Sequence, residues 1–377
     1  MSTRCHVATR KGLFTLDRGA SKWSISRASF LGDNCTTVMH DPRNGELIAT
    51  LNHGHFGIKM HRSGDGGESW KEIATPKYPP MPEGYVPKVN PVSGMPIDWS
   101  LKLVWSLAAG GADEPGVVWC GTLPGGLFRS EDRGDSWELN SPLWNNPLRE
   151  EWFGGGADYP GIHSICVDPR NARRVTIGIS CGGVWRSKDG GLTWQSPGPG
   201  MRAEYMPPEK QFEPNIQDPH SVVQCRANPD MLWVQHHNGI FKSTDAGASW
   251  SEITNVKPAA FGFAVTVHPK DANTAWFIPA VKDEKRYPLD GRVVVNRTRD
   301  GGKTFETLRR GLPQEHAYDL VYRHAFDIDE SGDRLAFGST TGSLWLSEDA
   351  GESWQTLSSN LPPVYAVRFE KPELKET

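Results

Sequence analysis

The sequence Ser187-Lys188-Asp189-Gly190-Gly191-Leu192-Thr193-Trp194 recurs with small changes along the chain. Its pattern is Ser/Thr-x-Asp-x-Gly-x-Ser/Thr-aromatic. The Asp, Ser and Thr side chains are short enough to hydrogen-bond the unpaired backbone amides at the tip of a β-hairpin, and the glycine supplies a positive φ. The aromatic ring begins the return strand as a buried anchor. The other copies lie at residues 63–70, 130–137, 243–250, 298–305 and 347–354, with a stretched seventh copy at 15–23.

The spacing of the copies predicts the architecture. Their aspartates are 48 to 67 residues apart, which fits four short strands and their loops in each repeat. A composition of 40 glycines, 29 prolines and 15 tryptophans suits such a chain. We therefore predict an all-β, single-domain, seven-bladed β-propeller of four-stranded antiparallel blades over residues 1–377. The first repeat lacks an inner strand, and residues 364–369 are expected to supply it and close the ring.

The repeated phrase resembles the Asp-box, so the chain is similar to the BNR/Asp-box propeller superfamily. That superfamily includes sialidases, some endoglucanases, sortilin-type receptors and photosystem assembly factors. The resemblance implies that the box is a structural turn remote from any active site, and no box residue is placed in the site. It does not extend to a true sialidase. The chain has no Arg-Ile-Pro near its start, counts seven blades rather than six, and offers only Arg10, Arg202 and Arg323 as loosely placed arginines.

Charge and cysteine usage narrow the partners and the compartment. A net charge of −4 without a basic stripe argues against nucleic acid and anionic membranes as primary partners. The six cysteines are scattered without C-x-x-C spacing, which indicates reduced thiols. The first residues lack the basic and apolar regions of a signal peptide, and no apolar run is long enough to span a bilayer. We expect a cytoplasmic protein.

Long connections are expected on one face of the ring. Turns such as Asp41-Pro42 and Asp168-Pro169 join the first two strands of a blade and should share the bottom face with the boxes. The insertions at 75–100, 143–161, 197–220 and 282–292 then fall on the top. Long loops in compact proteins are often functional, although these could also simply cover apolar blade edges.

Seven of the twelve histidines align with this top rim: 53, 55, 163, 220, 236, 237 and 324. Imidazoles that converge there can act as acid–base groups or hold a divalent metal, although no H-x-x-x-H or H-E-x-x-H spacing marks a metal site. The expected catalytic residues are His163, His220, His237, Arg323 and His324, with the four histidines as candidate metal ligands. The alternative is that a polar rim uses its histidines to hydrogen-bond neighbouring loops.

The top loops supply the expected substrate contacts. A Tyr beside a Glu at 204–205 could activate a hydroxyl group, or could belong to a surface loop held by prolines. The expected substrate-binding residues are Arg10, Lys11, His53, His55, Trp152, Arg202, Glu204, Tyr205 and Tyr287. We expect an enzyme with lyase or hydrolase chemistry on a small polar or sugar-like substrate in a pocket at the top of the channel. The alternative is a non-catalytic propeller that binds a ligand or a protein.

Overall fold

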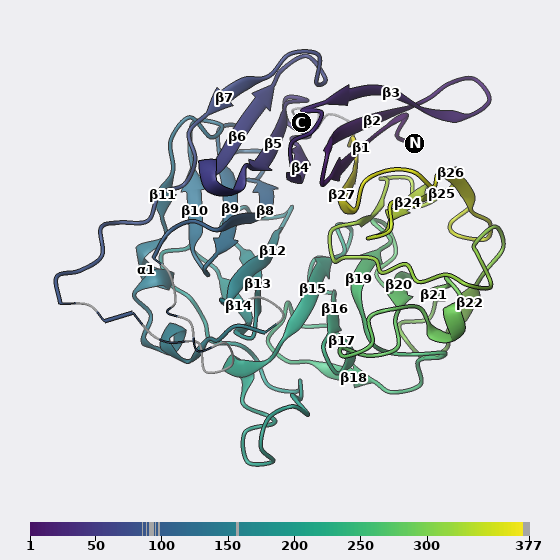
Figure 1. Ribbon diagram of the computed structural model, residues 1–377. Helices are drawn as coiled ribbons and strands as arrows, with labels where there is room; N and C mark the ends of the chain where they lie inside the picture. The colour runs from purple at the N-terminus through teal and green to yellow at the C-terminus, as the bar shows by residue number, and fades with distance from the viewer. Residues whose placement is uncertain are drawn as a thin grey trace.

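The structure is a computed structural model that describes residues 1–84, 86–87, 89, 94, 96, 99–155 and 158–371. Parts of the predicted top loops 75–100 and 143–161 lie outside the described residues. The described residues form seven antiparallel sheets arranged as blades around a central axis (Figure 1). The predicted seven-bladed propeller is therefore confirmed.

The first four blades run from the N-terminus to the middle of the chain, and the strands of each are named from the inner one outward. They are β27 (Val364–Phe369), β1 (Arg4–Thr9), β2 (Gly12–Arg18) and β3 (Trp23–Ser29); β4 (Cys35–His40), β5 (Leu47–Asn52), β6 (Ile58–Ser63) and β7 (Lys71–Ile73); β8 (Leu103–Ala109), β9 (Val118–Leu123), β10 (Leu127–Ser130) and β11 (Glu138–Leu139); and β12 (Gly161–Val167), β13 (Val175–Ser180) and β14 (Gly183–Ser187).

The last three blades follow the same order. They are β15 (Pro219–Gln224), β16 (Leu232–His236), β17 (Gly239–Ser243) and β18 (Ser251–Ile253); β19 (Gly262–Val267), β20 (Ala275–Pro279), β21 (Val295–Thr298) and β22 (Glu306–Leu308); and β23 (Phe326–Ile328), β24 (Leu335–Gly338), β25 (Leu344–Ser347) and β26 (Gln355–Ser358). The short helical segments α1 (Ser141–Trp144), η1 (Gly54–Phe56), η2 (Pro147–Glu151), η3 (Pro214–Ile216) and η4 (Leu289–Gly291) lie in the connections.

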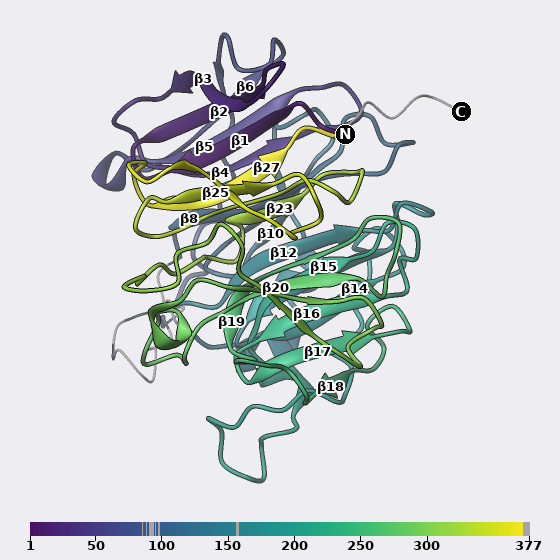
Figure 2. The same ribbon diagram turned by 90° about the vertical axis from the view of Figure 1, so that its right-hand side faces the viewer.

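The ring closes as the sequence predicts. Strand β27 pairs antiparallel with β1, with Cys5 opposite Phe369 and Val7 opposite Val367 (Figure 2). This pairing completes the first blade and leaves Val364, Val367 and Phe369 buried. Closure stabilises the ring because it removes the open sheet edges that a linear array would expose.

The fourth blade is the exception to four strands. Its outer strand is reduced to a single bridge between Arg186 and Gln195. Pro197 and Pro199 follow that bridge, and proline has no N–H to donate to a sheet ladder. The chain therefore leaves the blade after one pair and enters the long top connection at once.

The boxes form the expected hairpin turns. In the fourth blade the Thr193 N–H donates to Asp189 Oδ1 at 2.9 Å, and the Thr193 hydroxyl donates to Asp189 Oδ2 at 2.5 Å. Five other aspartates make the same pair of bonds: 65, 132, 245, 300 and 349. The stretched copy differs, because Asp17 lies in β2 and accepts instead from Arg4 Nε at 2.6 Å.

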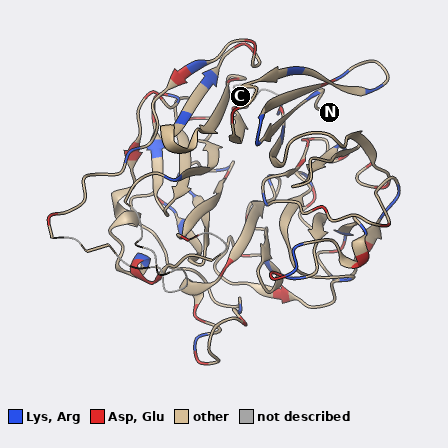
Figure 3. Cartoon of the chain, in the orientation of Figure 1, with Lys and Arg blue, Asp and Glu red and all other residues tan. Residues whose placement is uncertain are grey.

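The blades are held together by a buried aromatic layer. Trp119, Trp185, Trp233 and Trp276 are among the largest fully buried side chains. The Trp276 indole donates to the Ala350 carbonyl in the next blade at 3.0 Å, so the turn of one blade anchors its neighbour. Charged side chains of both signs are interspersed around the ring (Figure 3). Among the described residues, no helix is long and apolar enough to cross a membrane.

Candidate functional site

A carboxylate and two imidazoles meet where the fifth blade reaches the top of the channel. Asp218 Oδ2 lies 3.4 Å from His220 Nε2 and 3.5 Å from His237 Nδ1. All three atoms lie within 4.8 Å of one another. The Asp218 and His220 side chains are buried, whereas His237 keeps 22% of its side-chain surface exposed. A ligand that approaches from the top therefore meets His237 first.

The hairpin of β15 and β16 brings these three residues together. Pro219 pairs with His236, and the His237 N–H donates to the Asp218 carbonyl at 3.0 Å, so Asp218 and His237 lie opposite each other. The ladder has a register shift between Pro219 and Ser221, so His220 is an extra residue there, and its Nε2 lies 3.4 Å from Asp218 Oδ2. The site is thus a consequence of strand register at one end of a single hairpin.

The second oxygen of Asp218 is held by the fourth blade. Its Oδ1 accepts a hydrogen bond from the Ser180 hydroxyl and from the Cys181 N–H, both at 3.2 Å. Burial alone would raise the pKa of Asp218, but the two imidazoles outweigh it and hold that pKa well below its usual range. Burial likewise lowers the pKa of His237, and the Asp218 carboxylate outweighs that effect and raises it. The pair therefore favours a charged carboxylate beside a basic imidazole.

His220 is fixed on both sides. Its Nδ1 lies 2.7 Å from the Gly262 carbonyl, so Nδ1 carries a proton and Nε2 faces Asp218. Its ring stacks on Phe263 with centroids 4.4 Å apart. His237 in turn lies edge-on to Tyr205 at 4.9 Å and to Phe261 at 6.0 Å. Aromatic rings from two separate segments, the 201–209 loop and the start of β19, thus enclose the two imidazoles.

Arg323 connects this cluster to the seventh blade. Its Nε donates to the His220 carbonyl at 2.6 Å, and its guanidinium lies 4.6 Å from the Trp105 ring centroid and 5.7 Å from that of Phe263. Burial lowers the pKa of Arg323 to about 10, although Asp218 acts in the opposite direction. Arg323 is therefore a fixed positive charge at neutral pH, held between two aromatic rings.

His163 and His324 lie lower in the channel and contact each other. The His324 Nε2 lies 2.6 Å from the His163 carbonyl, and the His163 Nδ1 lies 2.9 Å from the Ser164 hydroxyl. The Nε2 of His163 is buried and has no hydrogen-bond partner among the described residues. Burial lowers the pKa of His324 to about 3 and that of His163 well below its usual range, so both imidazoles are neutral. The two do not join the Asp218 cluster as ligands of one centre.

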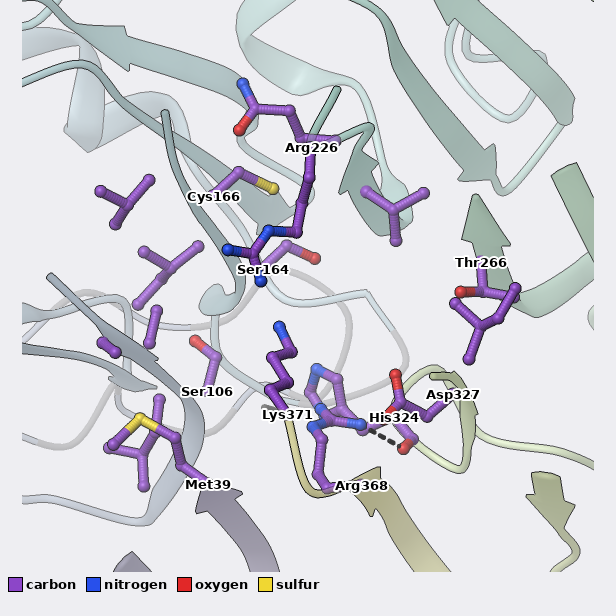
Figure 4. A pocket seen from close by; sticks show the side chains of 18 of the residues that line it. Met39, Ser106, Ser164, Cys166, Arg226, Thr266, His324, Asp327, Arg368 and Lys371 are labelled. Atoms are coloured by element: carbon purple, nitrogen blue, oxygen red, sulfur yellow. Dashed lines mark hydrogen bonds between the residues drawn. The ribbon is translucent and has the colours of Figure 1, made fainter. Parts of the chain in front are cut away.

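A cavity of about 430 Å³ continues from these two histidines toward the bottom turns. Strands β4, β8, β12, β15, β19 and β27 contribute to its wall. Figure 4 shows Arg226, Arg368 and Lys371 reaching into it, with His324 and Asp327 beside Arg368. Arg226 is paired with Glu330 at 2.7 Å, and burial together with Arg226 lowers the pKa of Lys371. Pro42, Pro169 and Pro269 of the bottom turns also line this cavity, so it extends away from the predicted top pocket.

The loop at 201–209 contacts the cluster through Tyr205, whose ring lies against His237. The Glu204 N–H donates to Asn238 Oδ1 at 2.9 Å, and Arg202 pairs with Glu252 at 2.8 Å and with Glu204. Tyr205 is 38% exposed, and its hydroxyl donates to the Ile216 carbonyl at 3.0 Å. The loop therefore places the Tyr205 ring against His237 and leaves part of that ring free.

Trp152 and Tyr287 occupy different environments from that loop. Trp152 is buried, donates from its indole to Asn215 Oδ1 at 3.0 Å and packs edge-on to Trp185 at 5.6 Å. It therefore supports the top loops from inside the core. Tyr287 lies in the β20–β21 connection, with its ring 6.3 Å from that of Tyr318.

The remaining predicted contact residues lie in the first two blades. Arg10 and Lys11 are exposed at the β1–β2 turn, where the Arg10 N–H donates to the Pro363 carbonyl. His53 Nδ1 lies 3.6 Å from Asp33 Oδ1, and the exposed His55 packs on Phe56. These contacts are with neighbouring parts of the first two blades, and they do not connect the four residues to Asp218.

Sequence reasoning placed His220 and His237 on the rim but left Asp218 out of the expected catalytic, substrate-binding and metal-binding residues. The available signal was the Asp218-Pro219-His220 triplet at the start of an inner strand. The hairpin register puts His237 opposite the first residue of this triplet, and the register shift at His220 brings the third residue to the same place.

Comparisons with known proteins identify relatives that are similar to this chain over only part of their length. No family model matches the chain. An oligoxyloglucan-reducing end-specific xyloglucanase of Emericella nidulans is 23% identical over 273 residues, which cover 63% of this chain and 30% of that protein. The xyloglucanase Xgh74A of Acetivibrio thermocellus is 27% identical over 152 residues, covering 34% of this chain and 16% of that protein. The chain thus spans less than a third of the length of these relatives.

Solved structures share the fold with this chain. The GH74 xyloglucanase from Xanthomonas campestris superposes with a TM-score of 0.65 at 16% identity, covering 95% of this chain and 53% of that one. YCF48 bound to D1 peptide gives a TM-score of 0.50 at 13% identity, covering 85% of this chain and 81% of that one. Both likenesses establish a propeller that resembles GH74 xyloglucanases and YCF48, and at these identities they establish the fold alone.

Proposed function

We propose that this chain is a propeller enzyme that acts on a small polar or sugar-like substrate at the top of its central channel, by hydrolase or lyase chemistry. The observation that carries the proposal is the contact of a buried Asp218 carboxylate with His220 and His237. Buried carboxylate–imidazole groups with shifted pKa values cluster at functional sites. The six free cysteines support a reducing compartment, and the proposal places the enzyme in the cytoplasm.

The proposed role of each residue follows from how exposed its side chain is. His237 is the accessible acid–base group, because Asp218 orients its ring and raises its pKa. Arg323 supplies a fixed positive charge that can neutralise a substrate carboxylate or a developing oxyanion. The partly exposed rings of Tyr205 and Phe261 offer apolar surface to one face of a sugar.

The relatives support a carbohydrate substrate without fixing which one. Among the proteins named as xyloglucanases, one is similar over 63% of this chain and another over 68%. Glycosidases usually place two carboxyl groups on either side of the scissile bond. The Asp218 centre has one carboxylate and two imidazoles, so the proposal names the substrate class and leaves xyloglucan as one candidate to assay.

The test is turnover on a panel of oligosaccharides that includes xyloglucan fragments. Wild type is expected to turn over at least one of them. His237→Ala is expected to lower kcat/KM by at least about 100-fold, the usual loss of a general acid–base group. The matched control is His53→Ala, which removes another rim histidine that faces an aspartate and should leave kcat/KM unchanged. Equal loss in both variants would contradict the assignment.

The second candidate is a propeller that binds a protein segment without catalysis. The observation that favours it is the likeness to YCF48 in a complex with a peptide. If wild type turns over none of the panel but selects peptides from a displayed library, and His237→Ala abolishes that binding, the binding function replaces the enzyme.

A further inference from the structure

We propose that Asp218, His220 and His237 bind one divalent cation of the Zn²⁺ type, with a fourth coordination position open to water or substrate. The ligand atoms are Asp218 Oδ2, His220 Nε2 and His237 Nδ1. The inference rests on the proposed function. With the cation bound, His237 Nδ1 is a ligand, and a metal-bound water would take the acid–base role that His237 has in a metal-free site. It replaces the four-histidine ligand set expected from the sequence.

The spacing of the three atoms carries the inference. The 3.4 and 3.5 Å separations from Asp218 Oδ2 are longer than a direct N–H···O hydrogen bond, which usually measures about 2.7–3.2 Å. Tetrahedral coordination with bonds of about 2.0–2.1 Å places neighbouring ligand atoms about 3.3–3.5 Å apart. The distances from Asp218 Oδ2 to His220 Nε2 and to His237 Nδ1 match this separation. Two of the three separations are thus those of metal ligands rather than of hydrogen-bonded partners, and the third, between the two imidazole nitrogens, is within 4.8 Å.

A second observation is that two of the three ligands are already oriented for a metal. The His220 Nδ1 donates its proton to the Gly262 carbonyl, which leaves the Nε2 lone pair directed at the site. Asp218 Oδ1 accepts from Ser180 and Cys181, which leaves Oδ2 available. Such supporting hydrogen bonds fix the tautomer and direction of metal-binding imidazoles and carboxylates in proteins.

The surroundings fit a catalytic rather than a structural metal. Three protein ligands with an open position are characteristic of catalytic zinc, whereas structural zinc usually has four. The ligands are neutral, neutral and negative, so a dication keeps net positive charge with which to polarise an oxygen. The open side is that of His237, the least buried of the three, next to Tyr205. A bound water there would have a lowered pKa and would lie within reach of substrate.

His163 and His324 are not part of this centre, because the ligand atoms that lie within 4.8 Å of one another belong to Asp218, His220 and His237. His324 Nε2 is directed at the His163 carbonyl, and His163 Nδ1 at the Ser164 hydroxyl. These two histidines therefore provide an internal comparison, since they are buried in the same channel and should not bind the cation.

The experiment uses protein made without a histidine tag and stripped with a chelator. Co²⁺ alone is titrated into it and followed by visible absorption, which reports tetrahedral coordination, and Zn²⁺ is then added in competition. Wild type is expected to bind one equivalent of Co²⁺ and to release it to Zn²⁺. His220→Ala, His237→Ala and Asp218→Asn are each expected to weaken Zn²⁺ binding by at least about 100-fold, since loss of only a supporting residue already costs about 10–100-fold.

The controls separate the metal from the fold and from the activity. Ser180→Ala keeps all three ligands and is expected to weaken binding by about 10-fold, and it tests the site even if Asp218→Asn does not fold. His324→Ala should bind as wild type does. The inference is overturned if the wild type binds neither Co²⁺ nor Zn²⁺. It is also overturned if the His237→Ala variant binds these ions as tightly as the wild type does. If that metal-free wild type still turns over a sugar in a His237-dependent way, only the metal fails and the proposed function stands.

Discussion

The box aspartates and Asp218 have the same side chain but lie in two different environments. Asp189 lies at a bottom turn, and both of its carboxylate oxygens accept hydrogen bonds from its own turn, at Ser187 and Thr193. Asp218 lies buried at the top, and only its Oδ1 accepts bonds from the neighbouring blade, while Oδ2 faces two imidazoles. A carboxylate whose two oxygens both accept hydrogen bonds from its own turn can stabilise that turn and nothing else. One that keeps an oxygen directed at basic groups can do chemistry.

The difference also appears in the origin of each carboxylate's pKa. Hydrogen bonds from Thr193 lower the pKa of Asp189 to about 2, so its charge is stabilised within a single turn of the chain. The low pKa of Asp218 arises against burial and depends on His220, two residues further along the chain in β15, and on His237, which follows β16. The first arrangement can be repeated in any blade, and the second needs one specific pair of strand ends.

The largest expected effect comes from opening the ring of blades, on which the environments of both Asp189 and Asp218 depend. A chain that ends at Leu361 lacks β27, which leaves β1 without its inner partner and exposes the apolar side chains at the ring seam. We expect loss of cooperative thermal unfolding, measured by circular dichroism or calorimetry. A melting transition as steep and as high as that of the full chain would show that the two environments do not share one cooperative structure.

The next effect concerns the buried carboxylate. In chelator-treated protein, removing both imidazoles by His220→Ala together with His237→Ala leaves Asp218 buried without its basic partners. We expect a loss of about 3–5 kcal/mol in the free energy of unfolding, as for other broken buried pairs, measured by urea denaturation. Adding Asp218→Asn to the double variant should recover part of that loss. No recovery would mean that the two imidazoles act by packing alone.

A smaller loss is expected at the box. Asp189→Ala removes exposed hydrogen bonds within one turn, and the free energy of unfolding should fall by about 1–2 kcal/mol. The same urea measurement applies, and the activity per folded molecule should match wild type. A catalytic defect without a stability change would reverse the assignment of the two faces.

The smallest expected effect is a pH dependence of the stability that Asp189→Ala removes. The folded pKa of Asp189 is about 2, below the usual unfolded value of about 3.9, so its stabilisation is present above the unfolded pKa. It disappears as the pH falls through the folded pKa. The difference in unfolding free energy between wild type and Asp189→Ala should therefore be constant above about pH 4.5 and shrink between about pH 4 and 2. A difference that persists at pH 2 would show that the carboxylate charge plays no part.

The sequence predicted the fold because its decisive features are local and repeated. The Asp189 turn, its five equivalents and the apolar strand at 364–369 each follow from short patterns. The outer strand of the fourth blade was overestimated, because the effect of Pro197 and Pro199 on the ladder was not weighed. The stretched copy at 15–23 matches the pattern without its geometry, since Asp17 pairs with Arg4 across two strands.

The candidate site was only partly predictable because it depends on register. Rim alignment gathers His220 and His237, but it also gathers His53 and His55, which contact Asp33 and Phe56 instead. Distinguishing them requires knowing that Asp218 lies opposite His237 in the β15–β16 hairpin. Composition and repeat spacing carry no information about that pairing, which becomes visible only when strand ends are placed in space.

The closing strand has a consequence for how the protein is made. Strand β27 is synthesised roughly 350 residues after its partner β1, which at about 5–20 residues per second is roughly 20–70 s of translation. During that interval β1 presents an unpaired edge while the later blades emerge from the ribosome one by one. The first blade to be translated is thus the last to be completed. The nascent chain must keep that edge from pairing with another strand until its own last strand arrives.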